Sequence, residues 1–533
     1  MKRAFLLFIT PVIWISLGPV FARDDYQRST TLDALHYRIR VEIKDQGDEI
    51  QGESEITFAT LEEGVRSIAL DFVALSVDKV TENDRPANFT HKDGRLAVTL
   101  AEGYKRGDRV RLLVKYHGKP ADGLYIKKNK FNDRTVFADN WPNRARYWFP
   151  AIDHPYDKAT VEFIVIAPDN FDVIANGSLV ETTSLQNGRK LSHWRQSVPI
   201  PTYCMVIGAT QFSIINAGAW ANVPVIYYLY PKDREKGIKD YGRAVEMLEF
   251  YTNLIGPYPY DKLALVESST RFGGMENSSN IFFDEKAFNG SGRLEGTVAH
   301  EIAHQWFGDS VTEADWHHLW LSEGFATYFE HVFFERVDGR EKFVRLMLED
   351  KETYLKANAA NSRPIYDTAT KDLFKLLNAN NYQKGGWVLH MLRHVVGDRA
   401  FFAAVRDYYQ RYRDRNAMTA DFQHVVEEHS NQKLDWFFDE WIYKAGHPVY
   451  EARWQWDEAR RELRLIITQK QEQAVFRMPL DVVVKTGDKI RLEIVQASER
   501  EQTFTFKLDS KPTAVAIDPD EWVLKELRLE ETQ

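Results

Sequence analysis

Two histidines and a glutamate, His300, Glu301 and His304, lie in a segment from Thr297 to Phe307 that contains neither proline nor glycine. A helix here would place the two histidines one turn apart in height and about 40° apart around the axis, so both imidazoles can bind one ion. Glu301 would lie to one side of that face. It is too poorly aligned to be a third ligand, yet close enough to reach a water on the metal. The spacing therefore predicts a metal site with a general base beside it.

The residue types favour zinc as the metal. Neutral imidazoles suit Zn²⁺, and a catalytic zinc site has three protein ligands and one water. The metal lowers the pKa of that water from ~15.7 to about 7, which allows Glu301 to remove its proton. Glu323 is a candidate third ligand, because Ser322 before it could cap a helix and would leave Glu323 in the first turn.

A packing interpretation of the two histidines remains open at this point. His390 and His394 have the same spacing, but no glutamate follows His390, and we interpret that pair as packing. Cys204 is the only cysteine, which excludes an intramolecular disulfide and cysteine-based metal sites. Any metal must therefore be bound by histidine and carboxylate.

The region before these residues is predicted to be a β domain, residues 23–222. Apolar and charged residues alternate in 37–43 and in 110–116, as on strands with one buried face. Asn176-Gly177 and Asn187-Gly188 are typical of hairpin turns. We expect a large antiparallel β domain.

Helical periodicity dominates residues 223–446, beginning with a helix expected over 236–254. Residues 447–533 return to short alternating strands, whose spacing is typical of a small β-sandwich. The chain is therefore predicted to be an α+β multidomain protein, with a β domain, a mostly α domain and a C-terminal β-sandwich.

Residues 1–22 are predicted to be a signal peptide. Lys2 and Arg3 precede an apolar run from Ala4 to Leu17, and Val20-Phe21-Ala22 supplies small residues where a signal peptidase cleaves. We expect an exported protein, periplasmic or extracellular, with no membrane association after cleavage; an uncleaved N-terminal anchor is the alternative. The 533 residues carry a formal charge of −9, which argues against nucleic acid as a partner.

Two motifs in the right order resemble the aminopeptidase N and leukotriene hydrolase family of gluzincin metallopeptidases. HExxH at 300–304 is followed by eighteen residues, 305–322, and then by Glu323, while Gly-Gly-Met-Glu-Asn precedes it at 273–277. The likeness spans the chain after residue 22, from the Phe149-Pro150 region to Pro448. It implies a thermolysin-like catalytic domain. It also implies three domains, with a more open cleft than in relatives that have a helical fourth domain.

The resemblance assigns one zinc ion per chain to His300, His304 and Glu323. Glu301 would be the general base and then the proton donor. Glu276 would bind the free α-ammonium of a peptide. The following residues would complete the substrate site: Gly273 and Gly274, whose backbone would pair with the substrate, Met275 beside the side-chain pocket, and Tyr382, whose hydroxyl would stabilise the oxyanion.

One segment departs from the family pattern. The family usually has Gln or Glu, touching the substrate amine, at a place that corresponds here to 139–141. Trp141 cannot accept a hydrogen bond in that role. Asp139 or Asn140 would bind the amine instead, with Asp139 the more natural partner.

We predict a zinc metallo-aminopeptidase that hydrolyses the N-terminal peptide bond of peptides through a zinc-activated water. A thermolysin-like zinc endopeptidase is the alternative. Glu276 discriminates between them, because an internal amide has no ammonium to offset the burial of a carboxylate. An inactive binding protein on the same scaffold is a third hypothesis, and an epoxide hydrolase side activity stays open.

Overall fold

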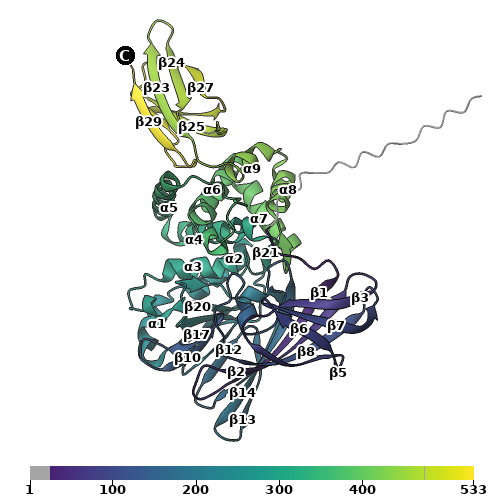
Figure 1. Cartoon of the computed structure of the whole chain (residues 1–533). Helices are drawn as coiled ribbons and strands as arrows, with labels where there is room; N and C mark the ends of the chain where they lie inside the picture. Colours follow the sequence, from purple (N-terminus) through teal and green to yellow (C-terminus); the bar gives the residue numbers. More distant parts are fainter. Residues whose placement is uncertain (1–23, 473, 533) are drawn as a thin grey trace, which may run out of the picture.

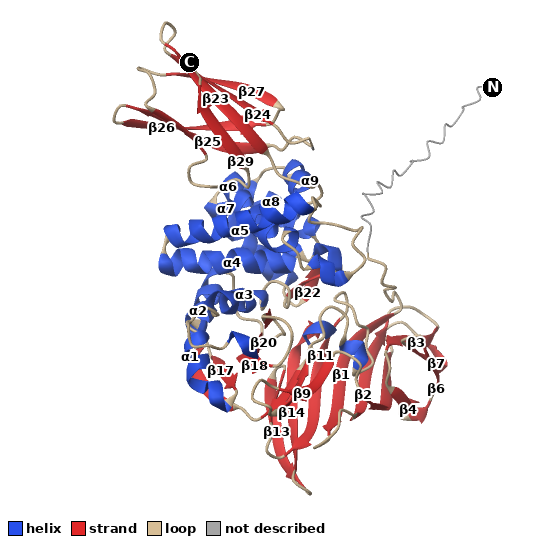
Figure 2. Ribbon diagram, turned by 60° about the vertical axis from the view of Figure 1, so that its left-hand side comes forward, coloured by secondary structure: helices blue, strands red, loops and turns tan. Residues whose placement is uncertain are grey.

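The computed structural model describes residues 24–472 and 474–532, so the predicted signal peptide lies outside the described residues. A helical region lies between two β regions (Figures 1 and 2). The predicted α+β order of β, mostly α and β is therefore confirmed. Among the described residues, no helix combines the length and apolar character needed to cross a membrane.

The N-terminal region is built on an eight-stranded sheet of order β13-β14-β11-β1-β2-β8-β4-β5. In that order the strands are Ser178–Leu185, Arg189–Pro201, Lys158–Pro168, Leu32–Ile43, Ile50–Thr60, Arg109–Gly118, Ser76–Glu82 and Arg85–Pro86. The pairs are antiparallel, as predicted, except that β1 and β11 run parallel. The chain leaves the sheet between β8 and β11, and such an excursion is what a parallel pair requires.

Side-chain alternation explains why these segments are strands. In β1, Tyr37, Ile39 and Val41 are fully buried while the residues between them reach solvent. Two smaller sheets complete the region, β12-β15-β10-β9 and β3-β7-β6. Their strands are Asp172–Ala175, Ile207–Thr210, Arg134–Ala138 and Leu124–Lys128, then Val65–Asp71, Arg95–Tyr104 and Asn88–Lys92.

The two predicted Asn-Gly turns differ in outcome. Asn187 and Gly188 both have positive φ and join β13 to β14, as a tight hairpin turn requires. Asn176-Gly177 instead joins β12 to β13, which lie in different sheets. The Asn176 side chain donates to the carbonyls of Cys204 and Ser278, so this turn is set by distant contacts.

The central region begins with a five-stranded sheet of order β16-β17-β18-β20-β19. The strands are Ser213–Trp220, Val223–Leu229, Leu263–Ser268, Asn280–Asp284 and Gly274–Met275. β19 is the edge strand and carries part of the predicted substrate motif. The edge position leaves one side of β19 without a strand partner in this sheet.

The nine helices described in the structure are α1 Arg234–Asp240, α2 Ala244–Leu254, α3 Glu295–His304, α4 Trp320–Asp338, α5 Arg340–Ala360, α6 Gly385–Val396, α7 Asp398–Tyr412, α8 Thr419–Ser430 and α9 Asp435–Trp441. Of these, α1, α2 and α3 lie against this sheet, and the other six lie beyond them, toward the C-terminal region (Figure 2). The prediction of one helix over 236–254 was wrong, because Gly242 at φ +53° separates α1 from α2. Two short parallel strands, β21 Val311–Glu313 and β22 Arg415–Ala417, link the loop after α3 to the loop after α7.

The C-terminal region is the predicted two-sheet β structure. One sheet has the order β27-β24-β23-β29 and the other β26-β25-β28. The strands are Glu501–Lys507, Glu462–Gln469, Val449–Asp457 and Glu526–Glu531, then Lys489–Ala497, Met478–Thr486 and Ala514–Ile517. Trp522 of this region stacks on His390 and His394 of α6, with ring centroids 4.6 and 5.0 Å apart. That pair of histidines therefore packs, as interpreted from the sequence.

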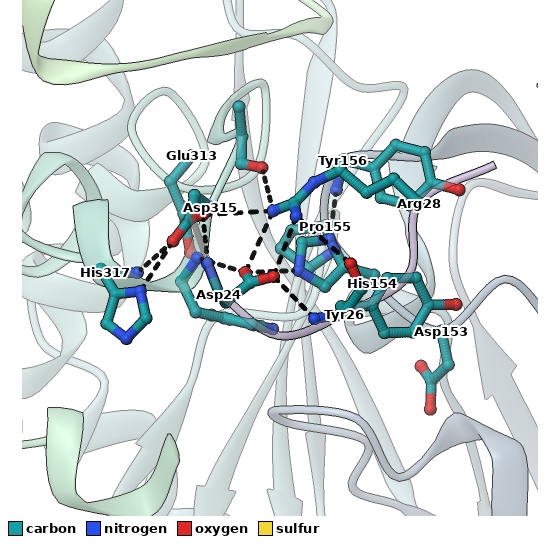
Figure 3. Close-up of polar contacts among 12 residues, drawn as sticks. Asp24, Tyr26, Arg28, Asp153, His154, Pro155, Tyr156, Glu313, Asp315 and His317 are labelled. Carbon is teal, nitrogen blue, oxygen red and sulfur yellow. Dashed lines mark hydrogen bonds and ion pairs between the residues drawn. The ribbon is translucent and has the colours of Figure 1, made fainter. Parts of the chain in front are cut away.

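A polar network ties the start of the described chain to both the N-terminal and the central region (Figure 3). The Asp24 carboxylate lies 2.8 Å from His154 Nε2, and the Asp24 backbone N–H donates to Asp315 at 2.9 Å. Arg28 pairs with the same Asp315 at 3.3 Å. The next residue, Trp316, packs edge-on against Trp141 at 5.6 Å. This network therefore helps to place Trp141.

Candidate active site

A cavity of about 340 Å³ lies between β19, α3, α4 and the π-helical turn η7, Asn380–Lys384, that precedes α6. The residues predicted as metal ligands and as the base all line it. So do Gly273, Gly274, Met275, Glu276 and Tyr382. The remaining lining residues are Trp141, Phe272, Thr297, Glu330 and Leu377. Elements far apart in the sequence thus bring one set of predicted residues together.

His300, His304 and Glu323 form a triangle of ligand atoms. His300 Nε2 lies 3.0 Å from His304 Nε2, and Glu323 Oε2 lies 3.3 and 3.2 Å from these two nitrogens. Ligands about 2.0–2.1 Å from a tetrahedral metal are separated by roughly 3.3–3.4 Å, so these edges fit one ion. Among the described residues these three form the group able to hold a metal. The donor set, two imidazoles and a carboxylate, is that of a catalytic zinc site.

The outer nitrogens of both histidines have partners that orient the rings. His304 Nδ1 lies 3.0 Å from the Phe307 carbonyl and 3.0 Å from Ser322 Oγ, which leaves Nε2 free to bind a metal. His300 Nδ1 faces Glu330 at 3.7 Å. The expectation that Ser322 caps a helix was wrong, because α4 starts at Trp320 and Ser322 lies inside it. Glu323 is in the first turn of α4, as expected.

Glycines allow Tyr382 and Glu301 to approach the site closely. A Cβ on Gly324 would lie 2.8 Å from Gly385 Cα, so this glycine pair lets α4 meet the turn that carries Tyr382. The Tyr382 hydroxyl then donates to Glu323 Oε1 at 2.7 Å. A Cβ on Gly274 would lie 2.2 Å from Glu301 Oε1. Any larger residue at position 274 would collide with the Glu301 carboxylate in its present position.

Both carboxylates beside the ligand triangle are buried. Burial raises the pKa of Glu301 to about 8, although His300 and His304 favour its charged form. Burial also raises the pKa of Glu276, which His304 opposes. A dication among these acids would favour the charged form of both.

Gln305 and Glu330 belong to the site but are absent from the sequence-based prediction. Gln305 donates to the Glu276 carbonyl at 2.6 Å and accepts from the Ser279 backbone N–H at 2.8 Å, so it ties the Glu276 loop to the end of α3. Glu330 follows Glu323 by seven residues, which is two helical turns on the same face. This spacing is a sequence signal from which Glu330 could have been placed near the metal ligands.

Asp139 and Asn140 lie outside the cavity. Asp139 is buried in an ion pair with Arg144, and Arg271 Nε lies 3.6 Å from its other oxygen. Asn140 donates to the carbonyls of Thr202 and Met205 and accepts from Trp148 Nε1 at 2.8 Å. The structure therefore does not bring these two residues together with the other predicted site residues, and their part in binding an amine stays a prediction. Trp141, which cannot accept, is the residue of this segment that lines the cavity.

Two stretches of the chain match described families. Residues 240–441 match the Peptidase family M1 domain, and residues 33–204 match the Peptidase M1 N-terminal domain. The chain is 29% identical over 453 residues to the tricorn protease-interacting factor F2 of Thermoplasma acidophilum, covering 80% of this chain and 56% of that protein. It is 27% identical to the glutamyl aminopeptidase of Rattus norvegicus, covering 78% of this chain and 48% of that protein. The chain thus spans about half the length of these curated relatives.

Solved structures share the fold of most of this chain. An M1 zinc metallopeptidase from Deinococcus radiodurans superposes with a TM-score of 0.67 at 26% identity, over 78% of this chain and 95% of that one. A mutant of a two-domain M1 zinc metallopeptidase bound to L-tryptophan gives a TM-score of 0.69 at 25% identity, over 79% and 96%. The likeness therefore covers most of this chain and nearly all of each solved chain.

Proposed function

Since this chain belongs to peptidase family M1, we propose that it is a zinc aminopeptidase that removes the N-terminal residue from peptides. The position of Glu276 carries the proposal. Glu276 lines the same cavity as the metal ligands, and the residue is 7% exposed. A substrate ammonium would compensate the burial of this charge, whereas an internal amide would leave it unpaired. A zinc endopeptidase is the alternative that this argument disfavours.

The remaining side chains suit the steps of peptide hydrolysis. Zn²⁺, when bound by the ligand triangle, would polarise the scissile carbonyl and lower the pKa of the attacking water. Glu301 would take the proton from that water and pass it to the leaving amine. The Tyr382 hydroxyl would turn from Glu323 to the oxyanion that forms on the carbonyl. The free edge of β19 at Gly274 would pair with the substrate main chain.

We further propose that the preferred N-terminal side chain is apolar. Trp141, Phe272, Met275 and Leu377 form an apolar part of the cavity wall. Arg271, which precedes Phe272, pairs with Asp122 at 3.3 Å and with Asp139, so its charge is already used. L-tryptophan in a related solved structure supports this choice.

Matched substrates test the proposal. Aminoacyl-coumarin derivatives of Leu, Phe, Trp, Glu and Lys are compared with an N-acetylated counterpart of the best one. Hydrolysis of the free forms alone, fastest for an apolar residue, is expected. Equal cleavage of the acetylated form would refute the exopeptidase assignment, and a preference for Glu would refute only the apolar pocket.

We also propose that the protein is exported, because residues 1–22 have the charge and apolar pattern of a signal peptide. N-terminal sequencing of protein recovered from its native compartment is expected to begin at Arg23. A chain that still begins at Met1 would support the uncleaved anchor instead.

A further inference from the structure

The edge strand β26 of the C-terminal region exposes an apolar face. Ile490, Leu492 and Ile494 alternate along it and are 72%, 56% and 61% exposed, the three most exposed large apolar side chains among the described residues. β26 pairs with β25 on one side only and lies at the outer edge of its sheet (Figure 2). Its other side therefore presents backbone groups able to pair with a further strand.

Three other edges in this chain are short or irregular, whereas β26 is neither. The edge strand β13 has a register shift at Leu179, and the edge strand β16 has one at Asn216. The edge strand β5 has only two residues. β26 runs for nine residues in unbroken register with β25 and contains no proline. It is thus long and regular enough to act as a template for another strand.

The sequence of β26 matches itself when two copies run antiparallel about Leu492. Ile490 then faces Ile494 of the other copy, and Leu492 faces its own equivalent. On the opposite face, Arg491 meets Glu493 of the other copy, twice. In one chain these two residues already form an ion pair, and their side chains are 51% and 29% exposed. Both the apolar and the charged faces are therefore complementary in the same register.

We propose that a second copy of this chain occupies the edge, and that two β26 strands pair across a twofold axis at Leu492. The two three-stranded sheets become one continuous six-stranded sheet, in which each protomer offers the same patch to the other. Pairing uses the free backbone groups and places the exposed apolar residues of the two copies in contact side by side. This inference concerns the C-terminal region and does not depend on the proposed catalytic activity.

Disulfide trapping tests the register directly. The only cysteine, Cys204, is fully buried, so an engineered cysteine gives an unambiguous signal. In the proposed dimer the two Leu492 Cα atoms are about 4.5–5.5 Å apart, within the range a disulfide spans. Leu492→Cys is expected to cross-link under mild oxidation. Ile490→Cys is the matched control, because its equivalents would lie about 14 Å apart, too far for a disulfide.

Charge exchange tests the same interface without cysteine. The dissociation constant of the full-length chain without its signal peptide is measured by analytical ultracentrifugation. Arg491→Glu or Glu493→Arg places like charges opposite each other twice, which is expected to raise the constant by at least about tenfold. A variant that carries both Arg491→Glu and Glu493→Arg again places opposite charges across the interface. Its dissociation constant is expected to return to the wild-type value. Val180→Lys, at an exposed position on the bulged edge β13, is expected to leave it unchanged.

Several outcomes overturn the proposal. One is a wild-type chain that stays monomeric at all accessible concentrations. Another is a dimer whose dissociation constant is unchanged by Arg491→Glu and by Glu493→Arg, while circular dichroism shows that both variants are folded. Cross-linking of Ile490→Cys as efficient as that of Leu492→Cys also contradicts the register.

Discussion

Replacing Tyr382 by phenylalanine removes one hydroxyl group and little else. The hydroxyl donates to Glu323 Oε1 at 2.7 Å, and the ring lies parallel to the His300 imidazole with centroids 5.9 Å apart. Phenylalanine keeps that ring contact. The variant therefore separates two roles for the hydroxyl, stabilisation of the oxyanion and support of the metal ligand Glu323.

The two roles predict different magnitudes. Loss of one oxyanion donor costs roughly 3–4 kcal/mol of transition-state stabilisation, which lowers kcat about 10²–10³-fold. The oxyanion is absent from the ground state, so KM is expected to change little. Support of Glu323 alone would act through metal affinity, and added Zn²⁺ would then restore the rate.

The assay combines steady-state kinetics on an aminoacyl-coumarin with the zinc content of the same preparation. We expect one zinc per chain in Tyr382→Phe, a large fall in kcat and a nearly constant KM. A rise in KM at constant kcat would refute the oxyanion role. Recovery of kcat with added zinc would instead assign Tyr382 to the support of Glu323.

Four further predictions follow from the site and from the N-terminal region. Glu301→Gln should retain zinc while kcat falls about 10²–10⁴-fold, and appreciable turnover would remove Glu301 from the base role. Chelation should abolish activity and Zn²⁺ should restore it; activity that survives thorough chelation would exclude the metal mechanism. Gly274→Ala should lower kcat without unfolding the chain, because its Cβ would meet Glu301 Oε1 at 2.2 Å, and wild-type kinetics would contradict this crowding. Burial raises the pKa of Asp157 to about 8 from 3.8, so the folded state favours its protonated form, and stability is lost as pH rises toward 8. Asp157→Asn should therefore gain stability relative to wild type between pH 4 and 8 in denaturant titrations, and a difference that does not vary with pH would refute this.

The metal site could be predicted from sequence because its geometry is local. His300, Glu301 and His304 lie on one helix, α3, whose fixed rise and rotation determine their relative positions. The resemblance supplied Glu323, which lies in the first turn of a second helix, α4. Because all three ligands lie on two helices, only the packing of α3 against α4 has to be known to complete the metal site.

The surroundings of Asp139 and Asn140 could not be predicted from the sequence, because they depend on how the chain folds. Asp139 is a plausible acceptor until Arg144 and Arg271 are placed beside it. Asn140 is likewise engaged by backbone groups of residues more than sixty positions away. Counting along the chain cannot show that such partners already use a side chain's hydrogen-bonding capacity.

The charges around the cavity connect the metal, the free N-terminus and the choice of side chain. Four glutamates line it, Glu276, Glu301, Glu323 and Glu330. A dication balances two of these charges, and a substrate ammonium balances one more. An acidic N-terminal side chain would cancel the charge that the ammonium brings, in a cavity where Arg271 is already paired with other acids. An apolar first residue would keep that balance and meet the apolar wall, so in the proposed reaction the arrangement that favours a free amine would also disfavour an acidic first residue.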